Sequence, residues 1–479
     1  MSAKVLPSRA DLTKNDQALW DLICNYASEI LPETFNPNPV SKRCLIWLPQ
    51  TIEGSSVCVA SSRLGQKLDQ QESWFDALRT LSVQIQRERK FLITAAGTTA
   101  DPFLRRIATL FGIRLVEFKQ FPRNPSASWF ERISEEQAKA APDAVTLTAW
   151  YQPVESSKQV ADANVNDLLV SIARSTILLS VRKRGKILRA AQSRLANLKR
   201  NPTGQAIPTT QLLINRKLTC QTVESDLLED GATGWWLYRE QEPAKNTHPE
   251  SPAKISPLPK TPNVHTGTST QAFVLQPDEI KPDEYLLHWT RRRVGPWPDQ
   301  TTPEFLDDLI FQNSRRNHNE LSSLCRILAA RKILASHDLT RDRRAVVCFS
   351  NLSIRDLPKR RVFRPHLSRW DFEPYGIAID RALMSQLGAK PVYYGEESEW
   401  ESLAPEQQPY FQLKQSRSEK IDWQTEREWR ILGDLPLDQI SHDRAFVFVG
   451  ETSDVDLIAG LTHWPIVVVP TNGLANQGA

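Results

Sequence analysis

The C-terminal half contains a histidine, a tyrosine and two glutamates whose types and order could build one chemical site. They are His288, Tyr375, Glu426 and Glu428. A neutral imidazole can donate a hydrogen bond to a hydroxyl, an aromatic face can hold a flat ring, and a carboxylate can stabilise positive charge on a reacting sugar. We therefore interpret the histidine, the tyrosine and one late glutamate as an ordered trio in a nucleotide site.

Three arginines and a serine near the trio are candidates for holding a cofactor. Arg369, Arg427 and Arg430 could each bind a pyrophosphate through charge-assisted hydrogen bonds. Ser350 ends an apolar strand-like run and is the fourth candidate.

Each member of the trio also has a purely structural interpretation. The histidine could bond only a backbone carbonyl, and the tyrosine could belong to the core. Glu428 could pair with Arg427 or Arg430. Taken singly, each residue fits the structural interpretation much better, and taken as an ordered trio they fit it only slightly better than a site.

Two loops in the N-terminal half could bind an anion, because each follows an apolar strand-like run. The first carries Ser61 and Arg63, and the second carries Gly97, Thr98 and Thr99. Small residues let backbone amides face a ligand, and the helix N-terminus that follows the second loop favours negative charge. The alternative is an ordinary helix cap made by Thr99 or by the aspartate two residues later.

A third candidate loop lies in a strongly basic segment. Between Arg182 and Arg200 there are eight basic residues and no acidic one. Arg182, Arg184 and Gly185 stand at a strand-to-helix turn and could neutralise a phosphate of a nucleotide or nucleic acid. We interpret the later basic residues of the segment as solvated surface, which is the usual role of a charge run.

Alternating apolar and amphipathic runs must position the N-terminal loops. Strand-like runs at 44–48, 57–60, 91–94 and 113–118 alternate with helical patterns at 73–87 and 102–111. This spacing predicts right-handed crossovers and a buried parallel sheet. Residues 1–40 are predicted to carry one helical segment, and 41–240 to form an α/β Rossmann-like parallel-sheet domain that binds a nucleotide.

Composition changes abruptly after residue 240. Residues 241–275 are rich in Pro, Ser, Thr and Lys, which predicts a linker. The remaining residues, 276–479, contain many short strand-like runs with helices gathered early, which predicts an α+β split-sheet domain. Among these runs is a strand that begins at Tyr375, directly after a proline.

The whole chain has the composition of an ordinary water-exposed protein. It has 479 residues, of which 40% are hydrophobic and 24% charged, and a net charge of +4 that permits a phosphate-bearing partner. We expect neither a signal peptide nor a membrane span, and therefore a cytoplasmic location. Six scattered cysteines predict no metal site and no disulfide framework.

The N-terminal half resembles the Rossmann-like superfamily of the DNA-processing protein A and the "lonely guy" phosphoribohydrolases. The resemblance covers about 41–240 and rests on the loop with Gly97, the basic turn with Gly185 and the closing run 227–232. This resemblance implies that the domain binds a nucleotide or nucleic acid more strongly than it implies that the domain hydrolyses one.

The C-terminal half resembles the ADP-ribosyltransferase fold over about 283–450, and it is also similar to an uncharacterised bacterial family with CFS and EWR signatures. The resemblance implies NAD as cofactor. It implies that His288 anchors a ribose, that Tyr375 stacks on nicotinamide, and that Glu428 bonds a ribose hydroxyl, with Glu426 as its competitor.

Together these patterns favour a nucleotide-sensing domain joined to an NAD-dependent ADP-ribosyltransferase or NAD-cleaving domain. By analogy, such a pair suggests bacterial stress or phage defence. The competing hypothesis is a non-enzymatic protein that binds nucleic acid through 182–200. A third hypothesis is nucleotide hydrolysis in the N-terminal loops.

Overall fold

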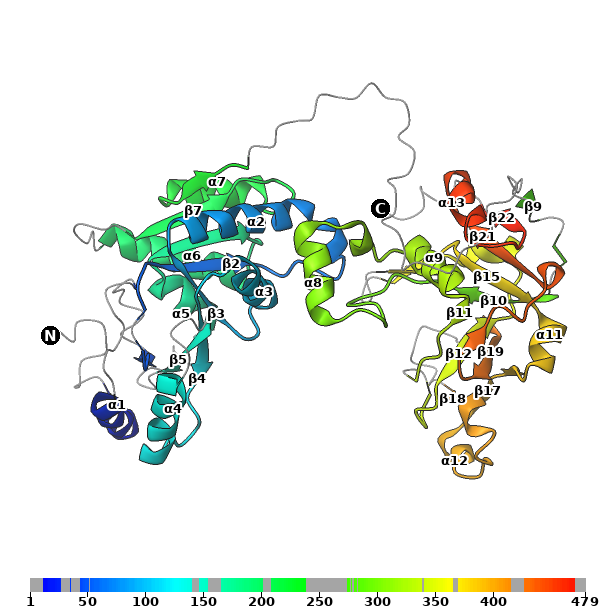
Figure 1. Ribbon diagram of the computed structural model, residues 1–479, viewed down its shortest axis with the longest axis horizontal. Helices are drawn as coiled ribbons and strands as arrows, with labels where there is room; N and C mark the ends of the chain where they lie inside the picture. Colours follow the sequence, from blue (N-terminus) through cyan, green and yellow to red (C-terminus); the bar gives the residue numbers. More distant parts are fainter. Residues whose placement is uncertain are drawn as a thin grey trace, which may run out of the picture. The chain divides into compact units, whose positions relative to one another are not determined.

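The computed structural model describes residues 12–26, 35, 44–50, 52–139, 146–153, 165–200, 208–237, 274–275, 277, 280–281, 283–337, 340–364, 369–414 and 426–469. These residues form two compact units (Figure 1). Unit 1 comprises Met1–Ala253 and Pro298–Arg316, and unit 2 comprises Lys254–Trp297 and Asn317–Ala479. Within the predicted linker, 241–275, only the short strand β9 (Val274–Leu275) is described.

Unit 1 is built on an eight-stranded sheet in the order β1-β5-β4-β3-β2-β6-β7-β8. All neighbouring strands are parallel except β1 and β5. The predicted parallel sheet is thus confirmed. Its strands are β1 (Cys44–Trp47), β2 (Ser56–Ser61), β3 (Phe91–Ala95), β4 (Leu115–Gln120), β5 (Thr146–Pro153), β6 (Ser175–Ser180), β7 (Thr209–Leu213) and β8 (Thr233–Trp235).

Strand β1 corrects one detail of the prediction. It pairs antiparallel with β5 at the edge of the sheet rather than parallel with its sequence neighbour. Only residues 48–55 separate β1 from β2, and this connection is too short for the crossover that parallel strands require. Trp47 of β1 instead packs with helices α1 (Lys14–Tyr26) and α4 (Ala127–Lys139) in a separate small core.

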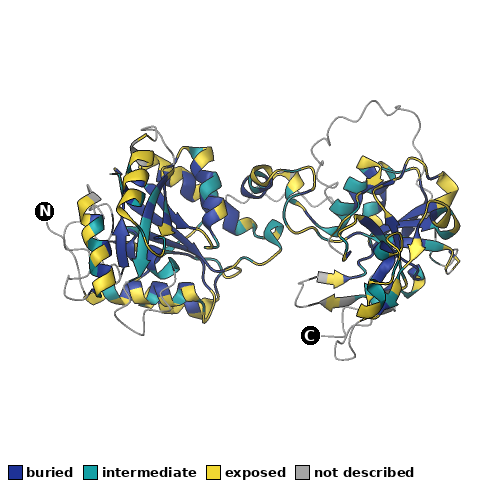
Figure 2. Ribbon diagram, turned by 90° about the horizontal axis from the view of Figure 1, so that it is seen from below, coloured by how far each residue is buried: buried dark blue, intermediate teal, exposed yellow. Residues whose placement is uncertain are grey.

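Helices cover both faces of the unit 1 sheet. The helices α5 (Val165–Ile172), α6 (Lys186–Arg200) and α7 (Gln221–Glu229) pack on one face. The opposite face carries α2 (Glu72–Arg87), α3 (Asp101–Phe111) and α8 (Thr302–Phe311). Figure 2 shows buried strands between helices whose outer sides are exposed.

Helix α8 belongs to unit 1 although it follows the predicted linker and the first strand of unit 2. Its local sequence fixes its start: Thr301 and Glu304 form a reciprocal capping box, and a proline occupies the first turn. Its apolar side, with Phe305, Leu309 and Ile310, joins the core beneath α2 and α3. The prediction that 276–479 forms one domain therefore differs from the structure at Pro298–Arg316.

Ion pairs and hydrogen bonds join α8 and the residues that follow it to α2 and α3. Arg106 of α3 donates to both carboxylate oxygens of Asp307, at 2.6 and 2.5 Å. Past the end of the helix, Gln312 donates through its side chain to Asp76 Oδ1 at 2.6 Å. Arg316 also pairs with Glu72 of α2.

Unit 2 is built on a mixed eight-stranded sheet in the order β16-β19-β12-β10-β15-β21-β22-β9. Its first six strands are antiparallel to their neighbours, whereas β22 is parallel to β21 and to β9. The strands are β10 (Tyr285–Trp289), β12 (Val346–Ser350), β15 (Gly376–Asp380), β16 (Lys390–Pro391), β19 (Glu428–Leu432), β21 (Ala445–Val449) and β22 (Ile466–Val468). The predicted second sheet is confirmed, and it is mixed.

Each face of the unit 2 sheet has its own core. The face covered by α9 (Glu320–Ala330), α11 (Arg381–Gln386) and α13 (Val455–Ala459), which we call the α9 face, holds the larger cluster. The opposite face, which we call the α10 face, packs on α10 (Leu357–Arg360).

Short elements complete unit 2. They are the helix α12 (Glu397–Trp400) and the strand pairs β11 (Lys332–Ile333) with β20 (Leu435–Pro436), β13 (Val362–Arg364) with β14 (Arg369–Asp371), and β17 (Tyr393–Gly395) with β18 (Phe411–Leu413). Among the described residues of both units, no helix is long and apolar enough to cross a membrane.

Candidate functional site

Strands β2 and β6 lie side by side in unit 1, yet the chain leaves them in opposite directions. From β2 it proceeds through α2 to β3, and from β6 through α6 to β7, on the other side. Loops that leave adjacent parallel strands toward opposite faces open a crevice at the carboxyl ends of those strands. Both the Ser61–Arg63 loop and the Arg182–Gly185 loop begin at this point, which we call the switch-point edge.

Hydrogen bonds join the two loops into one surface. The backbone amide of Ser62 donates to Ser180 O at 2.8 Å, and the amide of Arg182 donates to Ser62 Oγ at 3.1 Å. The Arg182 guanidinium donates to Arg63 O at 2.6 Å. Ser61 is buried, and its hydroxyl accepts from the Trp74 indole at 3.0 Å, so it supports the loop from below.

The turn after β6 has an unusual backbone. Arg184 lies in the left-handed region with φ 66°, which is costly for a side chain other than glycine. Next to it, a Cβ added to Gly185 would lie 3.2 Å from Arg182 O, so this position favours glycine for close packing. The tight turn leads directly into the first turn of α6, which contains no acidic residue.

Four cations surround this turn. Arg63, Lys183, Arg184 and Lys186 are exposed, and none of them forms an ion pair within the described part of the chain. The edge therefore carries positive charge that no ion pair of the described residues neutralises.

The third predicted loop, after β3, lies at the same edge of the sheet but has its own internal bonds. Gly97 has φ 85°, and Thr98 Oγ1 donates to Ala95 O at 3.0 Å. No described hydrogen bond joins this loop to the other two. Neither alternative cap is observed: the N-cap of α3 is Ala100, without a side-chain bond, and Asp101 accepts from Thr94 Oγ1 at 2.9 Å. Thr99 is partly buried, and no described hydrogen bond involves its side chain.

The basic segment 182–200 divides into two parts. Its first residues line the switch-point edge, whereas Arg194 is buried with 1% of its surface exposed. The prediction that the later basic residues are solvated surface is therefore wrong for Arg194. Its place on the same helical stripe as Ile187 and Ala191 turns it toward the sheet.

In unit 2, strand register decides which predicted residues meet. Ser350 pairs with Leu287 and with Glu428, and Leu287 belongs to the core of the α10 face. Glu428 therefore lies on the α10 face, because paired residues point to the same side of a sheet. Trp289 also packs on this face and donates through its indole to Ser350 Oγ.

Arg430 holds the Glu428 carboxylate in place. Its Nε donates to Oε1 at 2.9 Å and its Nη2 to Oε2 at 3.4 Å. The remaining donors bond Pro409 O, Phe411 O and the Gln412 side chain at 2.8–3.1 Å. All five donors of this buried guanidinium are thus used within the protein, so it positions Glu428 rather than holding a pyrophosphate.

His288 lies on the opposite, α9 face. It pairs with Ile377, and its ring contacts Phe349 with centroids 5.5 Å apart. Its Nδ1 lies 3.0 Å from Cys348 O, and burial lowers the pKa of the imidazole to about 4, so the ring is neutral at pH 7. This agrees with the structural interpretation of a histidine bonded to a backbone carbonyl.

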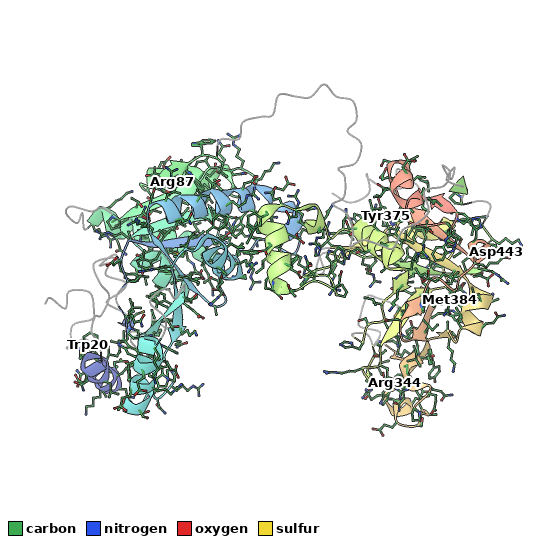
Figure 3. The ribbon with its side chains drawn as sticks, viewed as in Figure 1. Trp20, Arg87, Arg344, Tyr375, Met384 and Asp443 are labelled. Atoms are coloured by element: carbon green, nitrogen blue, oxygen red, sulfur yellow. The ribbon has the colours of Figure 1, made fainter. Side chains whose placement is uncertain are left out.

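Tyr375, labelled in Figure 3, also packs on the α9 face. Its hydroxyl donates to Asp454 Oδ2 at 3.0 Å, and burial followed by the Asp454 charge raises the pKa of the phenol. The trio is therefore divided, with His288 and Tyr375 on one face of the sheet and Glu428 on the other.

The remaining predicted residues lie around Glu428 or outside the described side chains. Arg427, with φ 47°, is exposed and pairs with Asp283 at 3.4 Å. Glu426 is partly buried two residues before Glu428. Arg369 lies in β14, where only its backbone is described.

No family model, curated protein or solved structure matches this chain.

The structure adds two residues that the sequence interpretation missed. Cys220 precedes α7 in the loop after β7, next to the switch-point edge, and the Thr222 hydroxyl, the Val223 amide and the Lys183 charge lower the pKa of its exposed thiol. A cysteine directly before a helix that follows a strand was the available signal. In unit 2, burial and then the charges of Glu428 and Glu426 raise the pKa of Tyr394.

The described residues contain no group of three or more His, Cys, Asp or Glu side chains that could hold a metal ion. Cys348, across from Arg430, stays a thiol because burial and the nearby Glu428 raise its pKa to about 12.

Proposed function

We propose that unit 1 is a Rossmann-like domain that binds a phosphate-bearing nucleotide at the switch-point edge. The observation that carries the proposal is the junction of two loops at adjacent strands, joined by hydrogen bonds and surrounded by four cations without ion pairs among the described residues. Ligands of open α/β sheets bind in this position. Six free cysteines also suit a reducing compartment such as the cytoplasm.

In this proposal the phosphates lie against the first turn of α6. Its backbone amides point toward an anion there, and its dipole favours negative charge. Lys183, Arg184 and Arg63 supply charge from two sides, while Gly185 keeps the turn narrow enough for close approach. The third loop, with Gly97, would contact another part of the ligand.

The first test is ligand binding to the full chain. AMP, ADP, NAD and inorganic phosphate are titrated calorimetrically against the protein and the double variant Arg63→Gln/Lys183→Gln. Each charged hydrogen bond is worth about 1.5–3 kcal/mol, so the double variant is expected to bind at least about tenfold more weakly. Arg114→Gln is the matched control, because Arg114 is exposed before β4, at the opposite edge of the sheet.

Cys220 gives the same test an independent readout. Its lowered pKa predicts fast alkylation by iodoacetamide near pH 7.5, and bound nucleotide should protect it. Cys24 is also exposed and serves as an internal reference that the ligand should not protect. Equal protection of both thiols, or nucleotide affinity unchanged in the double variant, would count against the switch-point edge as the site.

A second candidate function is favoured by the arrangement around Glu428. This carboxylate is held by Arg430 while 17% of its side chain stays exposed, and it shares the α10 face with Trp289 and Ser350. We propose that it stabilises the oxocarbenium-like ribose formed when water or another acceptor displaces nicotinamide from NAD. The nucleotide bound by unit 1 would then regulate this reaction.

Nicotinamide release from NAD tests this second function, with AMP or ADP added as candidate ligands of unit 1. Glu428→Gln is expected to lower release about 100-fold, because a preorganised charge acting on the transition state is lost. Glu426→Gln decides between the two glutamates. Tyr375→Phe is the control expected to keep the rate, since that hydroxyl faces Asp454 on the other face. No release from the unaltered protein would remove the support for NAD chemistry.

A further inference from the structure

The β13–β14 hairpin of unit 2 presents an aromatic pair to solvent. Phe363 and Trp370 lie directly opposite each other in the hairpin register, with ring centroids 5.3 Å apart. The two side chains are 42% and 39% exposed. Large aromatic residues bury most of their surface in ordinary cores, so an exposed pair on a two-stranded sheet suggests a ligand.

Positive charge surrounds this pair. The guanidinium carbon of Arg361 lies 4.6 Å from the centre of the Trp370 ring, and Arg361 donates to Glu373 Oε2 at 2.9 Å, which fixes its position. The register also places Arg364 directly opposite Arg369.

The sequence that leads into and through the hairpin is strongly basic. From Lys359 to Trp370 it contains five basic residues and no acidic one. The nearest acidic side chains, Asp371 and Glu373, are buried, and Glu373 is already paired with Arg361. The hairpin therefore combines two exposed aromatic rings with a cation that lies over one of them.

We propose that the β13–β14 hairpin binds single-stranded nucleic acid. Bases would stack on Trp370 and Phe363, and the backbone phosphates would pair with the arginines beside them. Single strands are bound in this way because every base has a stacking face, whereas the bases of a duplex are already stacked on one another. A membrane surface fits less well, because a guanidinium stacked on Trp370 breaks up the apolar face that acyl chains require.

The test uses the full chain and a fluorescein-labelled oligothymidine of about 20 nucleotides, followed by anisotropy at about 50 mM and about 200 mM salt. Trp370→Ala and Phe363→Ala are each expected to weaken binding about tenfold. Trp370→Phe keeps a stacking face and should stay within about threefold of the unaltered protein, which separates stacking from misfolding. Arg369→Gln should lower the salt dependence of binding.

Tyr393→Ala is the matched control, since Tyr393 is an exposed aromatic residue of unit 2 outside the hairpin, and its hydroxyl donates to Glu399. The Tyr393→Ala variant should bind the oligonucleotide as tightly as the unaltered protein does. The double variant Arg63→Gln/Lys183→Gln should also bind the oligonucleotide as the unaltered protein does. The proposal for the hairpin and the proposal for the switch-point edge are therefore tested independently.

Three results would overturn the proposal. The first is no binding of the oligonucleotide at the lower salt concentration. The second is equal binding by the protein, Trp370→Ala and Phe363→Ala, or equal competition by heparin, which would indicate charge alone. The third is a loss of binding to anionic phospholipid vesicles, but not to the oligonucleotide, in Trp370→Ala, which would assign the hairpin to a membrane surface.

Discussion

Replacing Arg194 by methionine is expected to lower the free energy of unfolding of unit 1 by about 3–5 kcal/mol, because several buried acceptors lose their donor at once. Its guanidinium donates to Thr210 Oγ1 at 2.9 Å, to Val170 O at 2.7 Å and to Ala173 O at 2.8 Å, with further bonds to Ser171, Arg174 and Thr209. Methionine fills similar space but satisfies none of these acceptors. Each buried carbonyl that loses its donor costs about 1–3 kcal/mol.

Among the described residues, no carboxylate pairs with Arg194. Several of its acceptors are carbonyls at the C-terminal end of α5, where the helix dipole is negative. The neighbouring Cys58 is not a counter-ion, because burial raises the pKa of its thiol to about 12. Arg194 therefore joins the end of α5 to the start of β7, and its loss should affect both.

Chemical denaturation measures this effect, and hydrogen exchange at the end of α5 locates it. Arg189→Met is the matched control, since Arg189 is exposed on the same helix and its replacement should change stability by less than about 0.5 kcal/mol. A free energy of unfolding within about 1 kcal/mol of the unaltered protein in Arg194→Met would contradict the prediction.

Leu309→Ala on α8 is expected to destabilise unit 1 by about 2–5 kcal/mol, the usual cost of truncating a buried leucine. Leu309 is 1% exposed and packs in the cluster formed by α2 and α3, so the change leaves a cavity in that core. The effect should be seen as faster hydrogen exchange in α2 and α3, which lie more than 190 residues earlier in the chain.

Phe311→Ala on the same helix is the control for this experiment. Phe311 is 45% exposed, so its truncation should cost much less than that of Leu309. Equal losses of stability in the two variants, or exchange altered only in unit 2, would show that α8 does not complete the core of unit 1.

The sequence predicted individual elements well because their signals are local. The strands at 57–60 and 91–94 and the helices at 73–87 and 102–111 occur within a residue of their predicted bounds, since apolar periodicity and turn residues mark them directly. The parallel sheet of unit 1 followed from the spacing of these elements. The edge strand β1 was misassigned because pairing direction depends on the connection that follows it.

The trio of His288, Tyr375 and Glu428 could not be tested by periodicity. Alternation within one strand fixes which residues share a face, but the face of one strand relative to another depends on register, which these short strands do not encode locally. The pairing of Ser350 with Glu428, and of His288 with Ile377, separates the three residues.

The burial of Arg194 and the placement of α8 were not predicted from the sequence, for different reasons. The helical spacing of Ile187, Ala191 and Arg194 contained the signal for burial, but the charge run around the arginine obscured it. The capping box of α8 is a local signal for the start of a helix, yet nothing in its own residues identifies the core that it joins. That choice depends on side chains of α2 and α3, far away in the sequence.

The placement of α8 has a consequence for how such a protein could be assembled by recombination. The chain passes between the two units after Ala253, after Trp297 and after Arg316, rather than once. A gene fusion made at the proline-rich segment alone would deliver the second half together with a helix that belongs to the first. Exchange of either half as an independent cassette therefore requires Pro298–Arg316 to be supplied with its own partner, so the two halves are constrained to evolve together.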